Sequence, residues 1–222
     1  MLNVKEYMNC FINHLKEVFG DRLLYVGLQG SYMRGEATES SDIDVVVILD
    51  ELHVADLIQY RKIVKTTKYP HKSCGFICGK KDMVNWNPME ICHLEHNTED
   101  YYGTLSNFIP KYTEQDVVHF IKLSLNNLYH EICHRYIHSD TGKSKHKIVG
   151  SYKGVFFIMQ NIYFLKSGVF VRTKKELLLH LEGMDEQIMK MALEMENNGD
   201  YEFDVAFELL FKWCQTHIRE MY

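Results

Sequence analysis

Residues 40–49 read Ser-Ser-Asp-Ile-Asp-Val-Val-Val-Ile-Leu. The apolar run over 43–49 is rich in β-branched residues, so it predicts a buried strand. Asp42 and Asp44 stand two apart where this strand begins, and alternation along a strand places both carboxylates on one face. Such a pair repels and shifts its pKa values unless a cation joins it. Magnesium meets this need, because it binds one or two carboxylates together with substrate phosphates.

A glycine-containing turn precedes this strand. Residues 30–35 read Gly-Ser-Tyr-Met-Arg-Gly and follow a predicted strand over 23–28. Backbone N–H groups where a strand passes into a short helix point outward and suit phosphate oxygens. We expect Gly30 to let a phosphate come close and the Ser31 hydroxyl to add a hydrogen bond. Arg34 either positions phosphates or braces the loop.

The chain divides into two parts by hydrophobic pattern. The first part has helical spacing over 3–19 and 51–66 and short apolar runs over 74–78 and 89–94, which we interpret as two further strands. After Pro110 only helical patterns follow, over 114–138, 145–166, 173–197 and 203–220. The sequence therefore predicts an α+β protein, with an α/β domain and a mixed sheet over residues 1–110 and an all-helical bundle over residues 111–222.

Composition narrows the classes of partner. The 222 residues carry a net charge of -5 and lack the broad basic field of a non-specific nucleic-acid binder, so nucleic acid is not expected as a partner, although a local basic patch stays open. No apolar run approaches the roughly 20 residues of a membrane helix, and the N-terminus has no signal-peptide pattern. We expect a cytoplasmic protein with six free thiols and no membrane partner. A homodimer stays open.

The order Gly30-Ser31, Arg34-Gly35 and Ser41-Asp42-Ile43-Asp44 before an apolar strand resembles the nucleotidyltransferase superfamily that includes DNA polymerase β. It is most similar to the antibiotic and the minimal nucleotidyltransferases. The helical half, with Tyr-Phe-Leu-Lys-Ser-Gly-Val-Phe at 163–170, resembles the C-terminal domain of the aminoglycoside enzymes.

The resemblance implies a reaction and assigns residues to it. Gly30 and Ser31 would hold the triphosphate of ATP or another NTP, and Asp42 and Asp44 would bind magnesium, as two ions. The hydroxyl of a small acceptor, such as an aminoglycoside-like antibiotic, would receive the nucleoside monophosphate and pyrophosphate would leave, which points to antibiotic resistance. Lys153, on the 145–166 helix, would reach the β- or γ-phosphate.

The resemblance also implies a third carboxylate on a neighbouring strand, and the 74–78 strand contains none. Glu90, between apolar neighbours on the predicted 89–94 strand, is the candidate for this catalytic position. Glu95 and Glu131 are the alternatives, Glu131 from the helical half. Two other functions therefore stay open, a protein AMP-transferase of toxin–antitoxin type and a nucleotide-binding module with impaired catalysis.

Two histidine arrangements are weighed and set aside. Residues 130, 134 and 138 are histidines that form one stripe on a helix, and solvated side chains explain them better than a zinc site. Cys92 and His93 are adjacent on the predicted 89–94 strand, where neighbours point to opposite faces, so they do not form a nucleophile pair.

Overall fold

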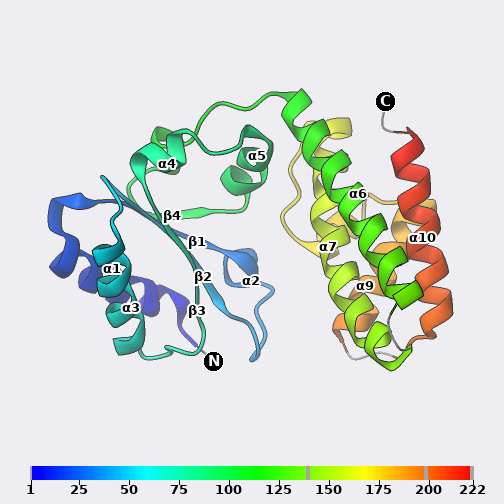
Figure 1. The fold of residues 1–222 in the computed structure, drawn as a ribbon, viewed down its shortest axis with the longest axis horizontal. Coiled ribbons are helices and arrows are strands. Elements are labelled where there is room, and N and C mark those ends of the chain that lie inside the picture. Colours follow the sequence, from blue (N-terminus) through cyan, green and yellow to red (C-terminus); the bar gives the residue numbers. More distant parts are fainter. Residues whose placement is uncertain (1, 139–140, 198–199, 221–222) are drawn as a thin grey trace. The chain divides into compact units, whose positions relative to one another are not determined.

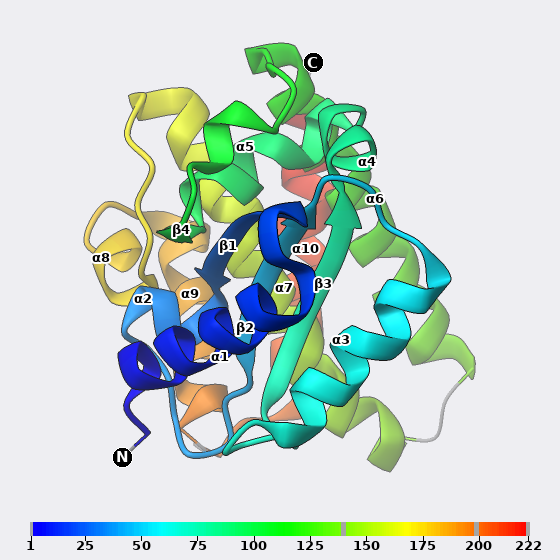
Figure 2. The ribbon, with the colours of Figure 1, turned by 90° about the vertical axis from the view of Figure 1, so that its left-hand side faces the viewer.

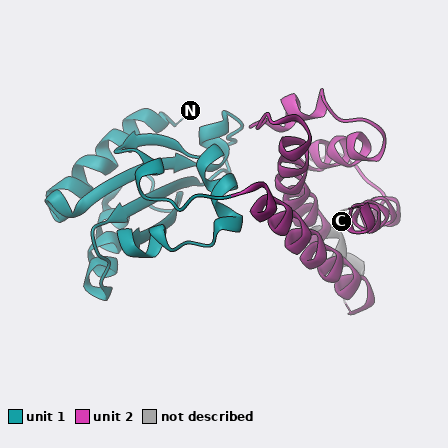
Figure 3. Cartoon of the chain, turned by 90° about the horizontal axis from the view of Figure 1, so that it is seen from above, with its two compact units in different colours: residues 1–112 teal, residues 113–222 magenta. Residues whose placement is uncertain are grey.

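The chain forms two compact units, residues Met1–Tyr112 and Thr113–Tyr222 (Figures 1 and 3). The computed structural model describes residues 2–138, 141–197 and 200–220. The first unit contains a mixed sheet and the second is made of helices, as predicted for an α+β protein. No helix within the described ranges is long and apolar enough to cross a membrane. All six cysteines are free.

The sheet of the first unit has four strands in the order β3-β2-β1-β4. They are β1 (Leu23–Gln29), β2 (Ile43–Leu49), β3 (Ser73–Gly79) and β4 (Glu99–Tyr102). Strand β1 runs antiparallel to both of its neighbours, whereas β2 and β3 are parallel. Strand β2 is therefore an inner strand that pairs on both edges.

Each face of this sheet packs against its own helices. Val45 and Val47 lie in a core with α1 (Val4–Phe19) and α3 (Val54–Thr66), which cross in front of the strands in Figure 2. Val46 and Ile48 point to the other face, in a core with α4 (Lys80–Val84) and α5 (Pro88–His96). The short helix α2 (Gly30–Arg34) connects β1 towards β2. Two 3-10 turns, Gly20–Arg22 and Leu105–Asn107, complete the unit.

The predicted strand over 89–94 is wrong, because these residues belong to helix α5. The Asn87 side chain accepts a hydrogen bond from the Met89 N–H at 3.2 Å, and Pro88 occupies the first helical position. This Asn-Pro start is a favoured helix N-terminus. The fourth strand is instead β4, which begins with the acidic residues Glu99 and Asp100 and therefore lacks the apolar run that would predict a strand.

The second unit contains α6 (Glu114–His138), α7 (Thr141–Ser167), α8 (Lys174–Leu178), α9 (Gly183–Glu196) and α10 (Phe203–Glu220). The single helix predicted over 173–197 is two helices, with Gly183 at φ 60° where α9 begins. Inside the unit, Asp185 accepts hydrogen bonds from Trp213 Nε1 at 2.6 Å and from His217 Nε2 at 2.8 Å. These bonds satisfy polar groups of a largely buried cluster.

Candidate active site

Asp42 and Asp44 lie where β2 begins. Asp44 precedes Val46 by two residues, so its carboxylate is on the α4–α5 face of the sheet and not on the face that α1 and α3 cover. Asp42 is exposed and Asp44 is half-buried. Burial raises the pKa of Asp44, and the negative charge of Asp42 raises it further. The two carboxylates therefore repel one another, and a cation between them would relieve the repulsion.

Gly30 packs directly against Asp44. It has φ +71°, a backbone conformation that favours glycine, and a Cβ added there would lie 2.0 Å from Asp44 Oδ2. Gln29, the residue before it, is the antiparallel partner of Asp44 in the sheet. The strand pairing therefore brings the glycine turn and the carboxylate together, as the sequence motif predicts.

Ser31 and Arg34 follow on α2. The Ser31 hydroxyl makes no hydrogen bond to any described residue, so it can donate to a ligand. Arg34 is largely buried, and its Nε donates to Glu36 Oε2 at 3.0 Å. Its positive charge lowers the pKa of Asp44 against the effect of burial. Arg34 thus braces the loop and also contributes positive charge to the site.

Cys74 occupies the position opposite Asp44 on the neighbouring strand. The two residues are partners in the parallel β2–β3 register, so their side chains share a face. Cys74 is largely exposed, and its partial desolvation raises the pKa of the thiol. The negative charge of the Asp44 carboxylate and hydrogen bonding to it add to this rise. Gly75 follows with φ +114° and approaches the Val45 backbone so closely that no side chain fits there. A thiol therefore lies where the resemblance implies a carboxylate.

Residues 11–82 match the sequence profile of the family described as "Nucleotidyltransferase domain". The first unit thus contains a segment that matches a nucleotidyltransferase domain. The matched residues include Gly30, Ser31, Asp42, Asp44 and Cys74, which the fold brings to one end of the sheet.

Curated relatives of this nucleotidyltransferase domain are short. A putative protein adenylyltransferase of Methanocaldococcus jannaschii is 39% identical over 49 residues, which are 22% of this chain and 49% of that protein. The protein adenylyltransferase MntA of Thermococcus cleftensis is 42% identical over 55 residues, 23% of this chain and 54% of that protein. A second putative protein adenylyltransferase of Methanocaldococcus jannaschii is 28% identical over 97 residues, 44% of this chain and 89% of that protein. The chain thus spans about half the length of the first two relatives.

The fold of the whole chain is similar to that of spectinomycin adenyltransferase AAD(9) from Enterococcus faecialis, a structure solved with ATP and spectinomycin. The TM-score is 0.64 at 14% identity, and the match covers 98% of this chain and 100% of that chain. At this identity the likeness establishes the fold, including a helical second part after the nucleotidyltransferase domain.

A histidine that the sequence interpretation set aside lies beside the site. Because α5 is a helix, His93 sits one turn before Asn97, whose amide Nδ2 lies 3.2 Å from His93 Nδ1. Burial lowers the pKa of His93 to about 4, with further contributions from the positive charges of Arg34 and His96. The ring is therefore neutral at pH 7, and an amide donor at Nδ1 places its proton on Nε2. The signal in the sequence was the Asn87-Pro88 helix start, which puts residues 93 and 97 on one face.

Glu90 lies in the first turn of α5 and not on a strand, so the prediction of its local structure is corrected. It is exposed, and its Oε2 accepts a hydrogen bond from Trp86 Nε1 at 2.6 Å. The Trp86 ring stacks on Phe76 of β3, with ring centres 5.7 Å apart. Trp86 thus links Glu90 to the edge strand that also carries Cys74. The alternative acid Glu95 is half-buried near the end of α5.

The remaining candidates lie in the second unit. Lys153 is exposed on α7. Glu131 on α6 accepts a hydrogen bond from Ser151 Oγ at 3.1 Å and pairs with Arg135. The histidines at 130, 134 and 138 are exposed, with successive ring centres 6.0 and 4.8 Å apart.

The donor set fits a hard divalent cation bound together with phosphate. Among the described residues, no group of three or more His, Cys, Asp or Glu side chains is arranged to hold a metal ion. Asp42 and Asp44 alone would therefore supply the protein ligands. Magnesium binds in this manner, with the rest of its oxygen ligands drawn from substrate phosphates and water.

Proposed function

We propose that the nucleotidyltransferase domain binds an NTP, with ATP as the first candidate, and transfers its nucleoside monophosphate to the hydroxyl of a small acceptor. The observation that carries this proposal is the 2.0 Å separation between a Cβ position on Gly30 and Asp44 Oδ2. A triphosphate on the glycine turn would meet the carboxylate pair directly, because no side chain stands between them.

Each residue of the site has a defined task in this reaction. Asp42 and Asp44 would hold magnesium, as two ions, which neutralises phosphate charge and favours ionisation of the attacking hydroxyl. The backbone of Gly30 and the hydroxyl of Ser31 bind phosphate oxygens, and Arg34 adds fixed positive charge nearby. The acceptor oxygen forms a bond to the α-phosphorus, the bond to the bridging α–β oxygen breaks, and pyrophosphate leaves.

The proton of the acceptor hydroxyl needs a base, and we assign Glu90 to this task. Its exposed carboxylate is oriented by Trp86, which packs on the same edge strand as Cys74. Glu90→Gln should lower kcat and leave nucleotide affinity within about twofold, since a general base contributes roughly 100-fold or more to the rate. Unchanged turnover would remove Glu90 from the mechanism.

The identity of the acceptor divides two versions of the proposal. AAD(9), whose fold this chain shares, was solved with spectinomycin, so spectinomycin is the first small acceptor to test. The curated relatives carry the name protein adenylyltransferase, which favours a protein hydroxyl as the second candidate. The likeness to AAD(9) covers 98% of this chain, whereas the first two relatives match 22% and 23% of it, which supports the small acceptor as the first choice.

One assay separates these versions. The protein is incubated with magnesium, ATP labelled at the α-phosphate, and either an antibiotic panel or a lysate of the source cells. A labelled small product supports the first version, and a labelled protein band supports the second. Pyrophosphate release should be abolished in the variant Asp42→Asn/Asp44→Asn. Nucleotide binding without transfer to any acceptor would instead indicate a module with impaired catalysis.

A further inference from the structure

Positive charge is concentrated in one stretch of this acidic chain. Residues 57–81 contain seven Lys or Arg and no Asp or Glu, although the net charge of the whole chain is -5. Four of these cations, Arg61, Lys62, Lys65 and Lys68, are exposed on and just after the second half of α3. None of the four forms an ion pair with any described residue. They therefore present a local positive field that the overall composition conceals.

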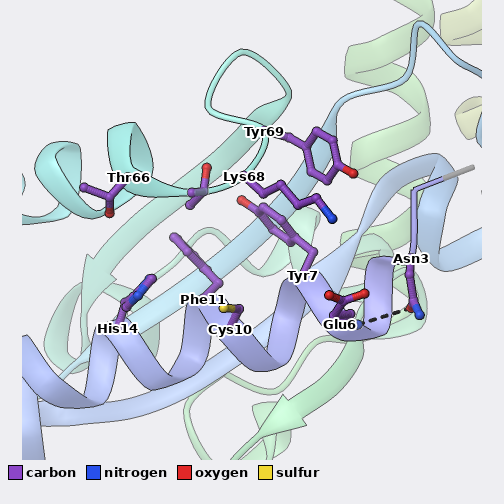
Figure 4. Close-up of a pocket in the computed structure, with 10 residues that line it drawn as sticks. Asn3, Glu6, Tyr7, Cys10, Phe11, His14, Thr66, Lys68 and Tyr69 are labelled. Atoms are coloured by element: carbon purple, nitrogen blue, oxygen red, sulfur yellow. Dashed lines mark hydrogen bonds between the residues drawn. The ribbon is translucent and has the colours of Figure 1, made fainter.

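A cavity with aromatic walls opens beside this basic stretch. It measures about 280 Å³ and lies between α1 and the residues that follow α3 (Figure 4). The rings of Tyr7 and Phe11 stack at 5.8 Å on the α1 side. Tyr69 lines the opposite side, with the Lys68 ammonium 5.6 Å from the centre of its ring. Among the lining residues, Glu6 supplies the one carboxylate.

Flat aromatic walls beside cations that have no ion-pair partner among the described residues favour one class of ligand. Aromatic side chains stack on nucleobases, and a neighbouring row of Lys and Arg follows the phosphate backbone. From Arg61 to the end of α3 at Thr66 the helix rises about 7.5 Å, at 1.5 Å per residue, and Lys68 lies beyond that end. The row of cations is therefore longer than one mononucleotide requires. An acidic protein would use the cations but would have no need of a cavity walled by rings.

We propose that this surface of the first unit binds single-stranded nucleic acid, with one base in the cavity and backbone phosphates along Arg61, Lys62, Lys65 and Lys68. The surface is separate from the candidate active site, because α1 and α3 cover the face of the sheet opposite to Asp44. The proposal therefore goes beyond the proposed function and does not depend on it.

The surface is nevertheless connected to the candidate active site by a short series of hydrogen bonds. The Tyr7 hydroxyl in the cavity wall hydrogen-bonds Ser73 Oγ at 2.6 Å, and Thr67 Oγ1 lies 3.2 Å from the same oxygen. Ser73 is the residue before Cys74, which faces Asp44. Lys72 in turn donates from Nζ to the Ser41 carbonyl at 3.1 Å, next to Asp42. A bound strand would thus contact residues that hydrogen-bond the short segment beside the carboxylate pair.

The experiment measures fluorescence anisotropy of a labelled 20-nucleotide oligouridylate at several salt concentrations. The variant Lys62→Gln/Lys65→Gln/Lys68→Gln should bind at least about tenfold more weakly in low salt. Its slope of log K against log salt should fall by about 2, since each phosphate contact on a single strand contributes roughly 0.7. The control replaces three exposed lysines of the second unit by Gln, at positions 175, 190 and 212, and should bind like the wild type.

The cavity is tested separately from the charges. Tyr69→Ala should weaken binding about tenfold, because stacking on one ring supports one base. Tyr69 also packs on the core, so Cys10→Phe, which places a ring at an exposed lining position, provides a second test and should weaken binding too. Three results would overturn the proposal. The first is no binding of the oligouridylate at 50 mM salt, and the second is equal weakening of its binding by the two triple lysine variants. The third is that poly-L-glutamate displaces the oligouridylate as well as unlabelled RNA does, while the cavity variants bind like the wild type.

Discussion

Gly30→Ala tests the contact on which the proposed site depends. Gly30 and Gly35 both have φ +71°, so an alanine at either position carries the cost of a left-handed conformation, about 1–2 kcal/mol. The two positions differ in their surroundings. A Cβ on Gly30 would lie 2.0 Å from Asp44 Oδ2, whereas a Cβ on Gly35 would meet nothing within 4 Å. To restore an ordinary contact, the Asp44 carboxylate or the turn must move by more than about 1 Å, and a displacement of this size can reduce activity about 100-fold.

Gly35→Ala is therefore the matched control. Both variants should lose about 1–2 kcal/mol in free energy of unfolding, measured with urea, from backbone strain alone. Only Gly30→Ala should also weaken binding of a magnesium complex of a non-hydrolysable ATP analogue, by tenfold or more in calorimetry. If the two variants bind the analogue equally well, the close approach of the turn to Asp44 has no part in nucleotide binding, and the reasoning is refuted.

Three further predictions concern neighbouring groups. Cys74→Asp adds a carboxylate opposite Asp44 and should lower the magnesium concentration for half-maximal nucleotide binding at least about tenfold, because a charge at about 4 Å near a surface interacts by about 4 kcal/mol. The control Cys74→Ser should keep the magnesium dependence of the wild type. An unchanged magnesium dependence in the Asp variant would contradict the placement of Cys74 opposite Asp44. Arg34→Met should raise the pKa of His93 above about 4, as followed by NMR titration, because burial remains as the main cause of the low pKa while the lowering by the guanidinium is removed. Asp56 accepts two hydrogen bonds from Arg22 at 2.8 and 2.9 Å, which hold its pKa at about 2. The Asp56 carboxylate therefore stabilises the folded state fully above its unfolded pKa near 4, and this contribution is lost as the pH falls towards 2. Asp56→Asn should lower the free energy of unfolding in urea by about 1–3 kcal/mol at pH 7 but by little at pH 2.

The sequence predicts the elements whose hydrophobic pattern has a single interpretation. Strand β2 has the predicted bounds 43–49, because a run of β-branched residues between polar segments fits only a doubly covered strand. The segment 89–94 has four apolar residues that suit either period, and its capping residue Asn87 decides for a helix. The break before Gly183 was missed because helical spacing continues on both sides of it.

The candidate site is predictable where it depends on neighbours in sequence and not where it depends on pairing across the sheet. The relation of Gly30 to Asp44 follows from a motif of fixed spacing. The position of Cys74 opposite Asp44 requires the parallel register of β2 and β3, which no local pattern specifies. The neutral His93 beside Arg34 requires both the helical state of α5 and the packing of that helix on the sheet.

The most direct test of the central claim is calorimetric titration of the protein with a non-hydrolysable ATP analogue, in magnesium and in EDTA. Binding should depend on magnesium in the wild type and be lost in Asp42→Asn/Asp44→Asn, while the folded state of the variant is retained. Equal affinity with and without magnesium, or unchanged affinity in the double variant, would show that these two carboxylates do not hold a metal-bound triphosphate.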